Sequence, residues 1–98
     1  MDYESTIGST GTVLVEFYAS WCPHCHKMMP VVAQVKELLA GQVPVIQLDI
    51  DEHSAAADSA GVESVPTFII YRNGREMWRQ SGEMDGEVLL RTVEKYLG

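Results

Sequence analysis

The chain has 98 residues, 46% of them hydrophobic, which is enough for one compact core, so we expect a single domain over residues 1–98. Its 14 acidic and 7 basic residues give a formal charge of -7, which argues against nucleic acid or an anionic membrane as a partner, because phosphate binding needs clustered Lys and Arg. No apolar run approaches the roughly 20 residues that a membrane span requires.

Patterns of apolar and turn residues predict four helices and four strands. In chain order these are a brief helix at residues 2–9, a strand at 13–18, a helix at about 23–40, a strand at 43–50, a short Ala-rich helix at 51–60, strands at 67–71 and 76–80, and a last helix from Asp85 onward. The first two strands should be parallel, because a helix connects them. This order predicts one sheet of four strands with helices on both faces.

Capping and turn residues mark the ends of these elements. Pro30 should kink the second helix, and Gly41 should end it. Asp51 can cap the third helix and Asp85 the fourth. Asn73-Gly74 is a strong signal for a hairpin between the last two strands. The fourth helix should bury three side chains, those of Leu89, Val93 and Leu97.

The only two cysteines stand three residues apart in Trp21-Cys22-Pro23-His24-Cys25, between a predicted strand and a predicted helix. Pro23 suits the first turn of the helix, where a missing N–H costs nothing. Cys22 should then lie exposed at the helix N-terminus, where unpaired N–H groups and the helix dipole favour an anion. Cys25 lies one turn deeper. The arrangement predicts a redox site, with Cys22 as the attacking thiolate and Cys25 as the resolving thiol.

Beyond this motif, the chain resembles the thioredoxin family over nearly its whole length. The matching pieces occur in the family's order and spacing, and they are Phe17-Tyr18-Ala19-Ser20-Trp21-Cys22, Cys25, Pro30, Val65-Pro66-Thr67, Arg72-Asn73-Gly74 and Gly82. A CxxC motif beside a βαβ unit is by itself a moderate signal for a thioredoxin-like redox motif. The other matching segments make the signal strong. The Cys-Pro-His-Cys motif is similar to that of the atypical desulfothioredoxin type.

The resemblance implies an α/β thioredoxin fold with a four-stranded mixed sheet, in which the family's opening edge strand is missing, and a cis peptide at Val65-Pro66. It implies a protein disulfide reductase that works through a mixed disulfide, with no cofactor beyond the redox-active pair Cys22 and Cys25. The implied partners are a thioredoxin reductase or another electron donor, and client proteins with disulfides. We expect a monomer.

The resemblance also implies a surface that binds clients. Its expected residues are Trp21, Pro23, Val65, Pro66 and Gly82. The Val65 backbone would pair with an extended client segment, as in strand addition. Trp21 has an alternative interpretation as core filler, but its place beside Cys22 favours a wall of this surface.

Two positions depart from the usual family pattern. His24 lies where thioredoxins usually have Pro, and it is either a solvated residue or a donor that stabilises the Cys22 thiolate and makes the protein more oxidising. Glu16 replaces the family's buried Asp, and Gln47 replaces a neighbouring Lys. Because its strand is otherwise apolar, we expect Glu16 to be buried, to have a raised pKa and to accept the proton of Cys25, unless its side chain reaches water past the sheet edge.

Other functions and locations remain open at this point. The acidic start of the chain lacks the basic and apolar regions of a signal peptide, which favours the cytoplasm, but a trimmed chain with a new initiator Met would look the same. The same fold could serve as an extracytoplasmic disulfide oxidant or isomerase, or as a redox-inert binding module. A zinc site at Cys22, His24, Cys25 and His26 is disfavoured, because zinc motifs bring pairs together from separate segments. We therefore expect no metal.

Overall fold

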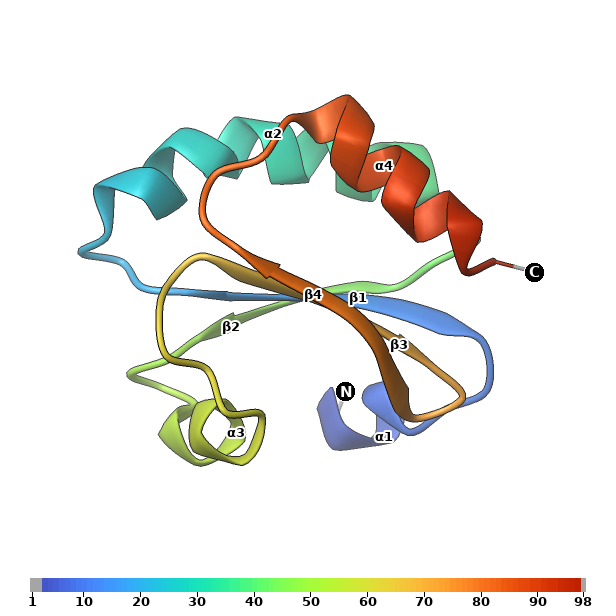
Figure 1. The fold of residues 1–98 in the computed structure, drawn as a ribbon, viewed down its shortest axis with the longest axis horizontal. Helices are drawn as coiled ribbons and strands as arrows, with labels where there is room; N and C mark the ends of the chain where they lie inside the picture. Colours follow the sequence, from blue (N-terminus) through green and yellow to red (C-terminus); the bar gives the residue numbers. More distant parts are fainter. Residues whose placement is uncertain (1–2, 98) are drawn as a thin grey trace.

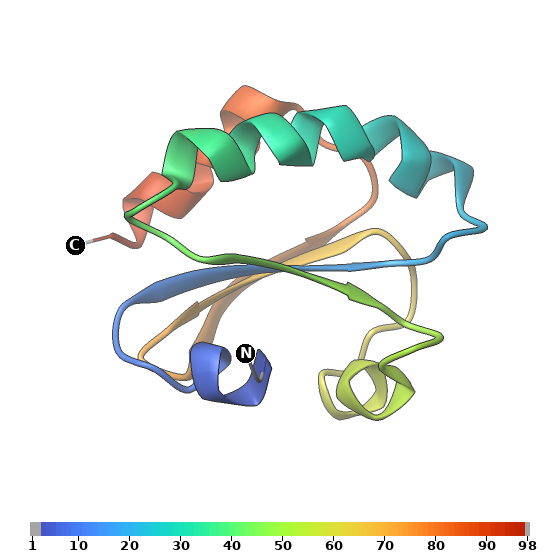
Figure 2. The same ribbon diagram turned by 180° about the vertical axis from the view of Figure 1, so that it is seen from behind.

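A four-stranded sheet lies between two pairs of helices (Figure 1). The computed structural model describes residues 3–97. In chain order the elements are α1 (Tyr3–Ile7), β1 (Thr12–Tyr18), α2 (Pro23–Leu39), β2 (Val45–Asp49), α3 (Ser54–Ser59), β3 (Thr67–Arg72), β4 (Arg75–Ser81) and α4 (Gly86–Lys95). The predicted order of helices and strands is confirmed. Helices α2 and α4 cover one face of the sheet and α1 and α3 the other, which Figure 2 shows from behind.

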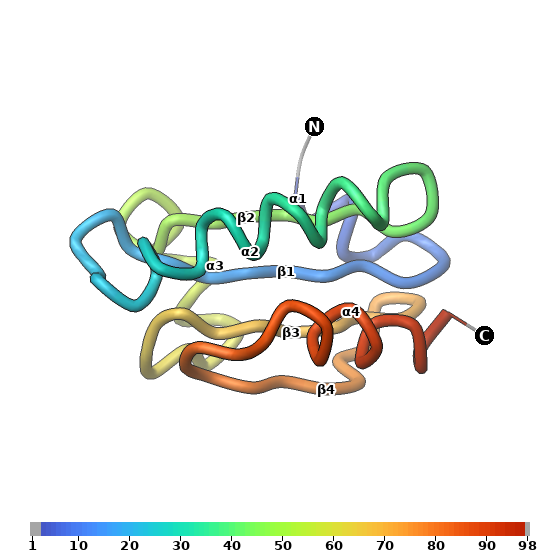
Figure 3. The backbone as a smooth tube through the Cα atoms, turned by 90° about the horizontal axis from the view of Figure 1, so that it is seen from above, coloured from blue at the N-terminus to red at the C-terminus, as the bar shows by residue number. Residues whose placement is uncertain are grey.

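The sheet is mixed, with the strand order β2-β1-β3-β4. Strand β1 pairs in parallel with β2 and antiparallel with β3, and β4 pairs antiparallel with β3. The parallel pair follows from α2, which crosses over the sheet between the two strands. Viewed from above, α2 runs over β1 and β2, while α4 lies over β3 and β4 (Figure 3). Strand β1 is therefore internal, with a partner on each side and helices on both faces.

The core forms on both sides of β1, because alternate side chains of a strand point to opposite faces. Leu14 belongs to the cluster under α2 and α4. Val13, Val15 and Phe17 belong to the cluster over α1 and α3. Each such side chain contributes roughly 1.5–3 kcal/mol by leaving water. Glu16 stands two residues after Leu14 and so shares the face that α2 covers, which places a carboxyl group in a closely packed layer.

Most of the expected element ends are confirmed. Asp85 caps α4, since its Oδ1 accepts hydrogen bonds from the N–H groups of the second and third residues that follow. Gly41 follows the end of α2 with φ 83°, and Asn73 and Gly74 turn the hairpin with φ 52° and 80°. These three positions need the left-handed conformation that Gly and Asn adopt most readily. Helix α2 continues through Pro30 without a break.

Two sequence-based predictions about helix ends are wrong. Asp51 does not cap α3, which begins at Ser54 with His53 before it and no side-chain cap. Leu97 is not buried with the other apolar residues of α4 but is 37% exposed, because the helix ends at Lys95 and its periodicity stops there. Arg72 binds the residues that follow this helix end: its Nη1 donates to the carbonyl oxygens of Tyr96 and Leu97 at 3.0 and 3.2 Å.

The strands also differ slightly from their predicted ranges. The first, third and fourth are longer by one or two residues, and β2 covers residues 45–49 instead of 43–50. Val43 follows the C-terminal turn of α2, and its N–H bonds to the Leu39 carbonyl, so it cannot join the sheet ladder. Among residues 3–97, no helix has the length and apolar character needed to cross a membrane.

Candidate active site

Three loops meet at one end of the sheet, on the left of Figure 1: β1–α2, α3–β3 and β4–α4. The first carries Cys22, and the second carries Val65-Pro66, whose peptide bond is cis as expected. The third begins at Gly82, whose N–H donates to the Pro66 carbonyl at 2.8 Å. The fold thus brings together residues that are more than forty positions apart in the chain.

Cys22 is the N-cap residue of α2, and its sulfur accepts the N–H of Cys25 at 3.3 Å. An anion at this atom is favoured by the unpaired N–H groups and by the dipole of the helix. The Cys22 thiol also donates to the Val65 carbonyl oxygen, with 3.7 Å between the atoms. The expectation of an exposed Cys22 is wrong: the residue is 4% exposed, because Val65, Ala19 and their neighbours pack around it.

Cys25 is buried one turn into α2. Burial, followed by its hydrogen bond to Cys22 and the charge of Glu16, raises the pKa of the Cys25 thiol to about 12. Such a thiol is almost fully protonated near neutral pH and does not attack without help. The two cysteines, which are both free thiols here, therefore lie in unlike environments one helical turn apart.

Glu16 is buried in the middle of the sheet, as expected, with 3% of its surface exposed. Desolvation raises the pKa of its carboxyl group, and a hydrogen bond from Gln47 opposes the rise in part. That bond joins Gln47 Nε2 to Glu16 Oε1 over 3.1 Å. A cavity of about 310 Å³ is lined by Glu16, Cys25 and Gln47, together with Tyr18 and Met29. The carboxyl group and the Cys25 thiol therefore share one cavity, which is large enough for water.

A groove of about 360 Å³ runs past Cys22, and Trp21, Pro23, Val62 and Val65 form its walls. Three of the five residues expected to bind clients line it. Trp21 is 65% exposed, so it is not core filler.

Sequence reasoning missed the residue that orients this ring. Trp21 Nε1 donates to Asp51 Oδ2 at 3.0 Å. The sequence predicts Asp51 as a helix cap, and the one sequence signal for its contact with Trp21 is its place directly after a strand parallel to β1. Because the carboxyl ends of parallel strands meet at one edge of the sheet, such a residue lies near the site.

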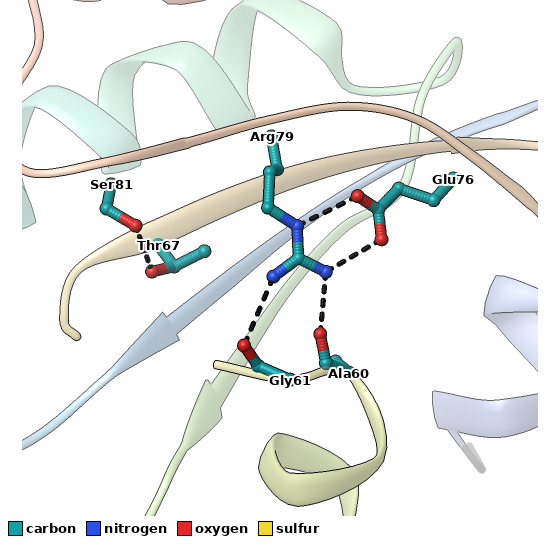
Figure 4. A network of polar contacts seen from close by, with 6 residues as sticks. All are labelled: Ala60, Gly61, Thr67, Glu76, Arg79 and Ser81. Atoms are coloured by element: carbon teal, nitrogen blue, oxygen red, sulfur yellow. Dashed lines mark hydrogen bonds and ion pairs between the residues drawn. The ribbon is translucent and has the colours of Figure 1, made fainter. Parts of the chain in front are cut away.

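Polar contacts hold the segment before Pro66. The Thr67 hydroxyl donates to the Ser64 carbonyl at 2.6 Å, so the Ser81 hydroxyl donates to Thr67 across 2.8 Å. Arg79 on β4 forms a bidentate ion pair with Glu76, and its Nη2 donates to the Ala60 carbonyl at the end of α3 at 2.6 Å (Figure 4). These bonds fix both ends of the loop that presents Val65 to the groove.

His24 contacts Glu83 rather than the sulfur of Cys22. Its Nδ1 lies 2.5 Å from Glu83 Oε2. The bond to His24, followed by the charge of Lys27, lowers the pKa of the Glu83 carboxyl. His26 bonds to the Ser20 carbonyl through its Nε2. Within residues 3–97, no three His, Cys, Asp or Glu side chains are grouped so that they could hold a metal ion.

A family model described as thioredoxin matches residues 1–95. The chain belongs to the thioredoxin family. It is 35% identical over 94 residues to the thioredoxin of Synechocystis sp. (strain ATCC 27184 / PCC 6803 / Kazusa), covering 96% of this chain and 88% of that one. Over 85 residues it is 35% identical to "Thioredoxin Y, chloroplastic" of Oryza sativa subsp. japonica, but the chain spans only about half, 51%, of that relative.

Solved thioredoxin structures share the fold. A mutant thioredoxin from Halobacterium salinarum NRC-1 superimposes with a TM-score of 0.88 at 30% identity, covering 98% of this chain and 83% of that one. Oxidised thioredoxin from Plasmodium falciparum gives a TM-score of 0.83 at 28% identity, covering 98% and 90%. The predicted thioredoxin fold is confirmed, and thiol–disulfide exchange is the activity associated with this family.

Proposed function

We propose that this thioredoxin is a protein disulfide reductase of the Cys-Pro-His-Cys, desulfothioredoxin-like type. The observation that carries the proposal is the unlike setting of its two thiols. Cys22 caps α2 beside an open groove, whereas Cys25 is buried next to Glu16 with a pKa raised to about 12. This difference assigns attack to one sulfur and resolution to the other.

The first step is attack of the Cys22 thiolate on a client disulfide. One client sulfur bonds to Cys22, and the other leaves as a thiolate. The client segment lies along the groove with its backbone beside Val65, which precedes β3 and whose carbonyl accepts the Cys22 thiol before that thiol ionises. The surrounding surface is formed by Trp21, Pro23 and Pro66, together with Gly82, whose N–H bonds to the Pro66 carbonyl.

In the second step the Cys25 thiolate attacks the Cys22 sulfur, so that the second client sulfur leaves and a Cys22–Cys25 disulfide forms. Two electrons have then passed from the dithiol to the client. Glu16 takes the Cys25 proton, because it shares a cavity with that thiol and burial makes its carboxylate a stronger base.

The dithiol must be restored by an electron donor such as a thioredoxin reductase. We place this reaction in the cytoplasm, where donors keep thiols reduced, and we propose that the chain acts as a monomer. The redox pair itself carries the electrons, so the proposed reaction needs no further cofactor.

Two cysteine variants test the proposal. Cys22→Ser should abolish reduction of insulin disulfides, because the attacking sulfur is lost. Cys25→Ser should still attack, but it should accumulate mixed disulfides, detectable by mass spectrometry as adducts that dithiothreitol removes. An active Cys22→Ser protein, or a Cys25→Ser protein without adducts, would contradict the assignment.

A further inference from the structure

The contact between His24 and Glu83 joins two segments 59 residues apart, the start of α2 and the loop before α4. Both side chains are accessible to solvent, with 65% of His24 and 41% of Glu83 exposed. Among residues 3–97, Glu83 is the hydrogen-bond partner of the His24 ring, and this contact orients the largely exposed ring.

Cys22 has other hydrogen-bond partners. Among the described residues, its sulfur bonds to the N–H of Cys25 and to the carbonyl of Val65. His24 lines the same groove as Cys22 but does not bond to this sulfur. Among residues 3–97, the donor to the Cys22 sulfur is therefore the Cys25 N–H, and the His24 ring adds no second one.

A histidine stabilises a nearby thiolate in two ways, by donating an N–H or by carrying a positive charge. The Glu83 carboxylate engages Nδ1 and so fixes the orientation of the ring, and its negative charge offsets, at the Cys22 sulfur, the positive charge of a protonated ring. The hydrogen bond to His24, followed by the charge of Lys27, lowers the pKa of the Glu83 carboxyl, so this group carries its negative charge at neutral pH.

We infer that Glu83 is a positioning residue that holds the His24 ring away from the Cys22 sulfur and so keeps the dithiol strongly reducing. The inference rests on the proposed function and adds to it a residue outside the CxxC motif. Other charged groups face this region: Glu63 lines the groove, and Asp51 holds Trp21. Neither has a hydrogen bond to His24 among the described residues.

The test is the equilibrium between the protein and the glutathione couple, measured at a pH where the Cys22 thiol is ionised. Oxidised glutathione takes two electrons from the dithiol and yields two glutathione molecules and the Cys22–Cys25 disulfide. Glu83→Ala should free the ring, stabilise the Cys22 thiolate and lower the equilibrium constant for this oxidation roughly threefold, or about 15 mV for a two-electron couple. Glu83→Gln keeps an acceptor for the ring and should give a smaller shift.

Two controls separate positioning from general charge removal. Glu63→Gln removes a carboxylate from the same groove without touching His24, so it measures the effect of charge alone. In a His24→Ala background, the effect of Glu83→Ala should fall to the size of the Glu63→Gln effect. The pH at which the ultraviolet absorbance of the thiolate appears should be lower in Glu83→Ala. In a His24→Ala background, Glu83→Ala should lower it only as far as Glu63→Gln does.

The outcomes distinguish this inference from the proposed function. If the unmodified chain does not exchange with glutathione, both the reductase proposal and the positioning role of Glu83 fail. If it exchanges but Glu83→Ala leaves the equilibrium constant unchanged, or shifts it equally with and without His24, the positioning role is refuted and the reductase proposal stands.

Discussion

Replacing Glu16 with Gln removes the proposed base while keeping the size of the side chain. In the free dithiol, where the Cys25 pKa is about 12, only about one Cys25 thiol in 10⁵ is ionised at pH 7 without help. Loss of a positioned base typically slows a reaction by ~10²–10⁴-fold. Removing the negative charge of Glu16 also eases ionisation of Cys25, but that charge is the smallest cause of the raised pKa. We therefore expect loss of the base to dominate.

The assay follows the second step alone. A chromophoric thiol is coupled to Cys22 as a mixed disulfide, and its release by Cys25 is recorded by stopped flow. In Glu16→Gln, release should be at least ~10²-fold slower at pH 7 and should rise tenfold per pH unit, because it depends on free Cys25 thiolate. In the unmodified protein, release should level off above the pKa of Glu16.

Asp49→Asn is the matched control, since Asp49 is a buried carboxyl on the neighbouring strand β2 whose Oδ1 accepts the Asp51 N–H outside the Cys25 cavity. It should leave the release rate unchanged. A Glu16→Gln protein that releases the thiol as fast as the unmodified chain, with the same pH profile, would refute the role of Glu16.

The Glu16→Gln variant also tests whether the Glu16 carboxyl group is buried, through its effect on the stability of the fold. Where folding raises the pKa of a carboxyl group, the folded protein loses stability as pH rises. The loss begins at the pKa of the unfolded state, near 4.5 for Glu16, and continues up to the pKa of the folded state. The loss is ~1.4 kcal/mol for each unit of pKa. Glu16→Gln should therefore match the unmodified protein below about pH 4.5 and be more stable near pH 8, because water in the cavity can satisfy the new amide. Urea unfolding at both pH values measures the difference, and equal stabilities at pH 8 would count against the desolvation of Glu16.

Three further variants test the framework of the fold and the surroundings of the site. Arg72→Met removes bonds to the carbonyls at the end of α4 and should lower the unfolding free energy by ~1–3 kcal/mol, measured with urea, without changing insulin reduction. Gly86→Ala places a methyl 2.9 Å from Val31 Cγ1 and should cost ~1–3 kcal/mol by the same assay, a loss that Val31→Ala should recover. Asp51→Ala frees the Trp21 ring and should raise KM for protein clients but not the rate with a small disulfide.

Local patterns in the sequence were sufficient to predict the framework. Apolar runs and turn residues gave the order of helices and strands, since periodicity and capping depend on residues close together in the chain. The burial of Glu16 was predictable for the same reason, because its neighbours on both sides are apolar strand residues. The place of Cys22 at the start of α2 followed from the Pro23 that comes after it.

Contacts between distant loops were decided only by the tertiary structure. Cys22 was expected to be exposed, but the loop ending at Val65 packs against it from 43 residues away. Asp51 binds Trp21 instead of capping a helix, and Glu83 binds His24 across 59 residues. No periodicity encodes such pairs, since each depends on where the sheet brings the ends of separate strands. A polar side chain that could bond to several neighbours in the sequence bonds instead to the partner that the folded structure places within hydrogen-bond distance.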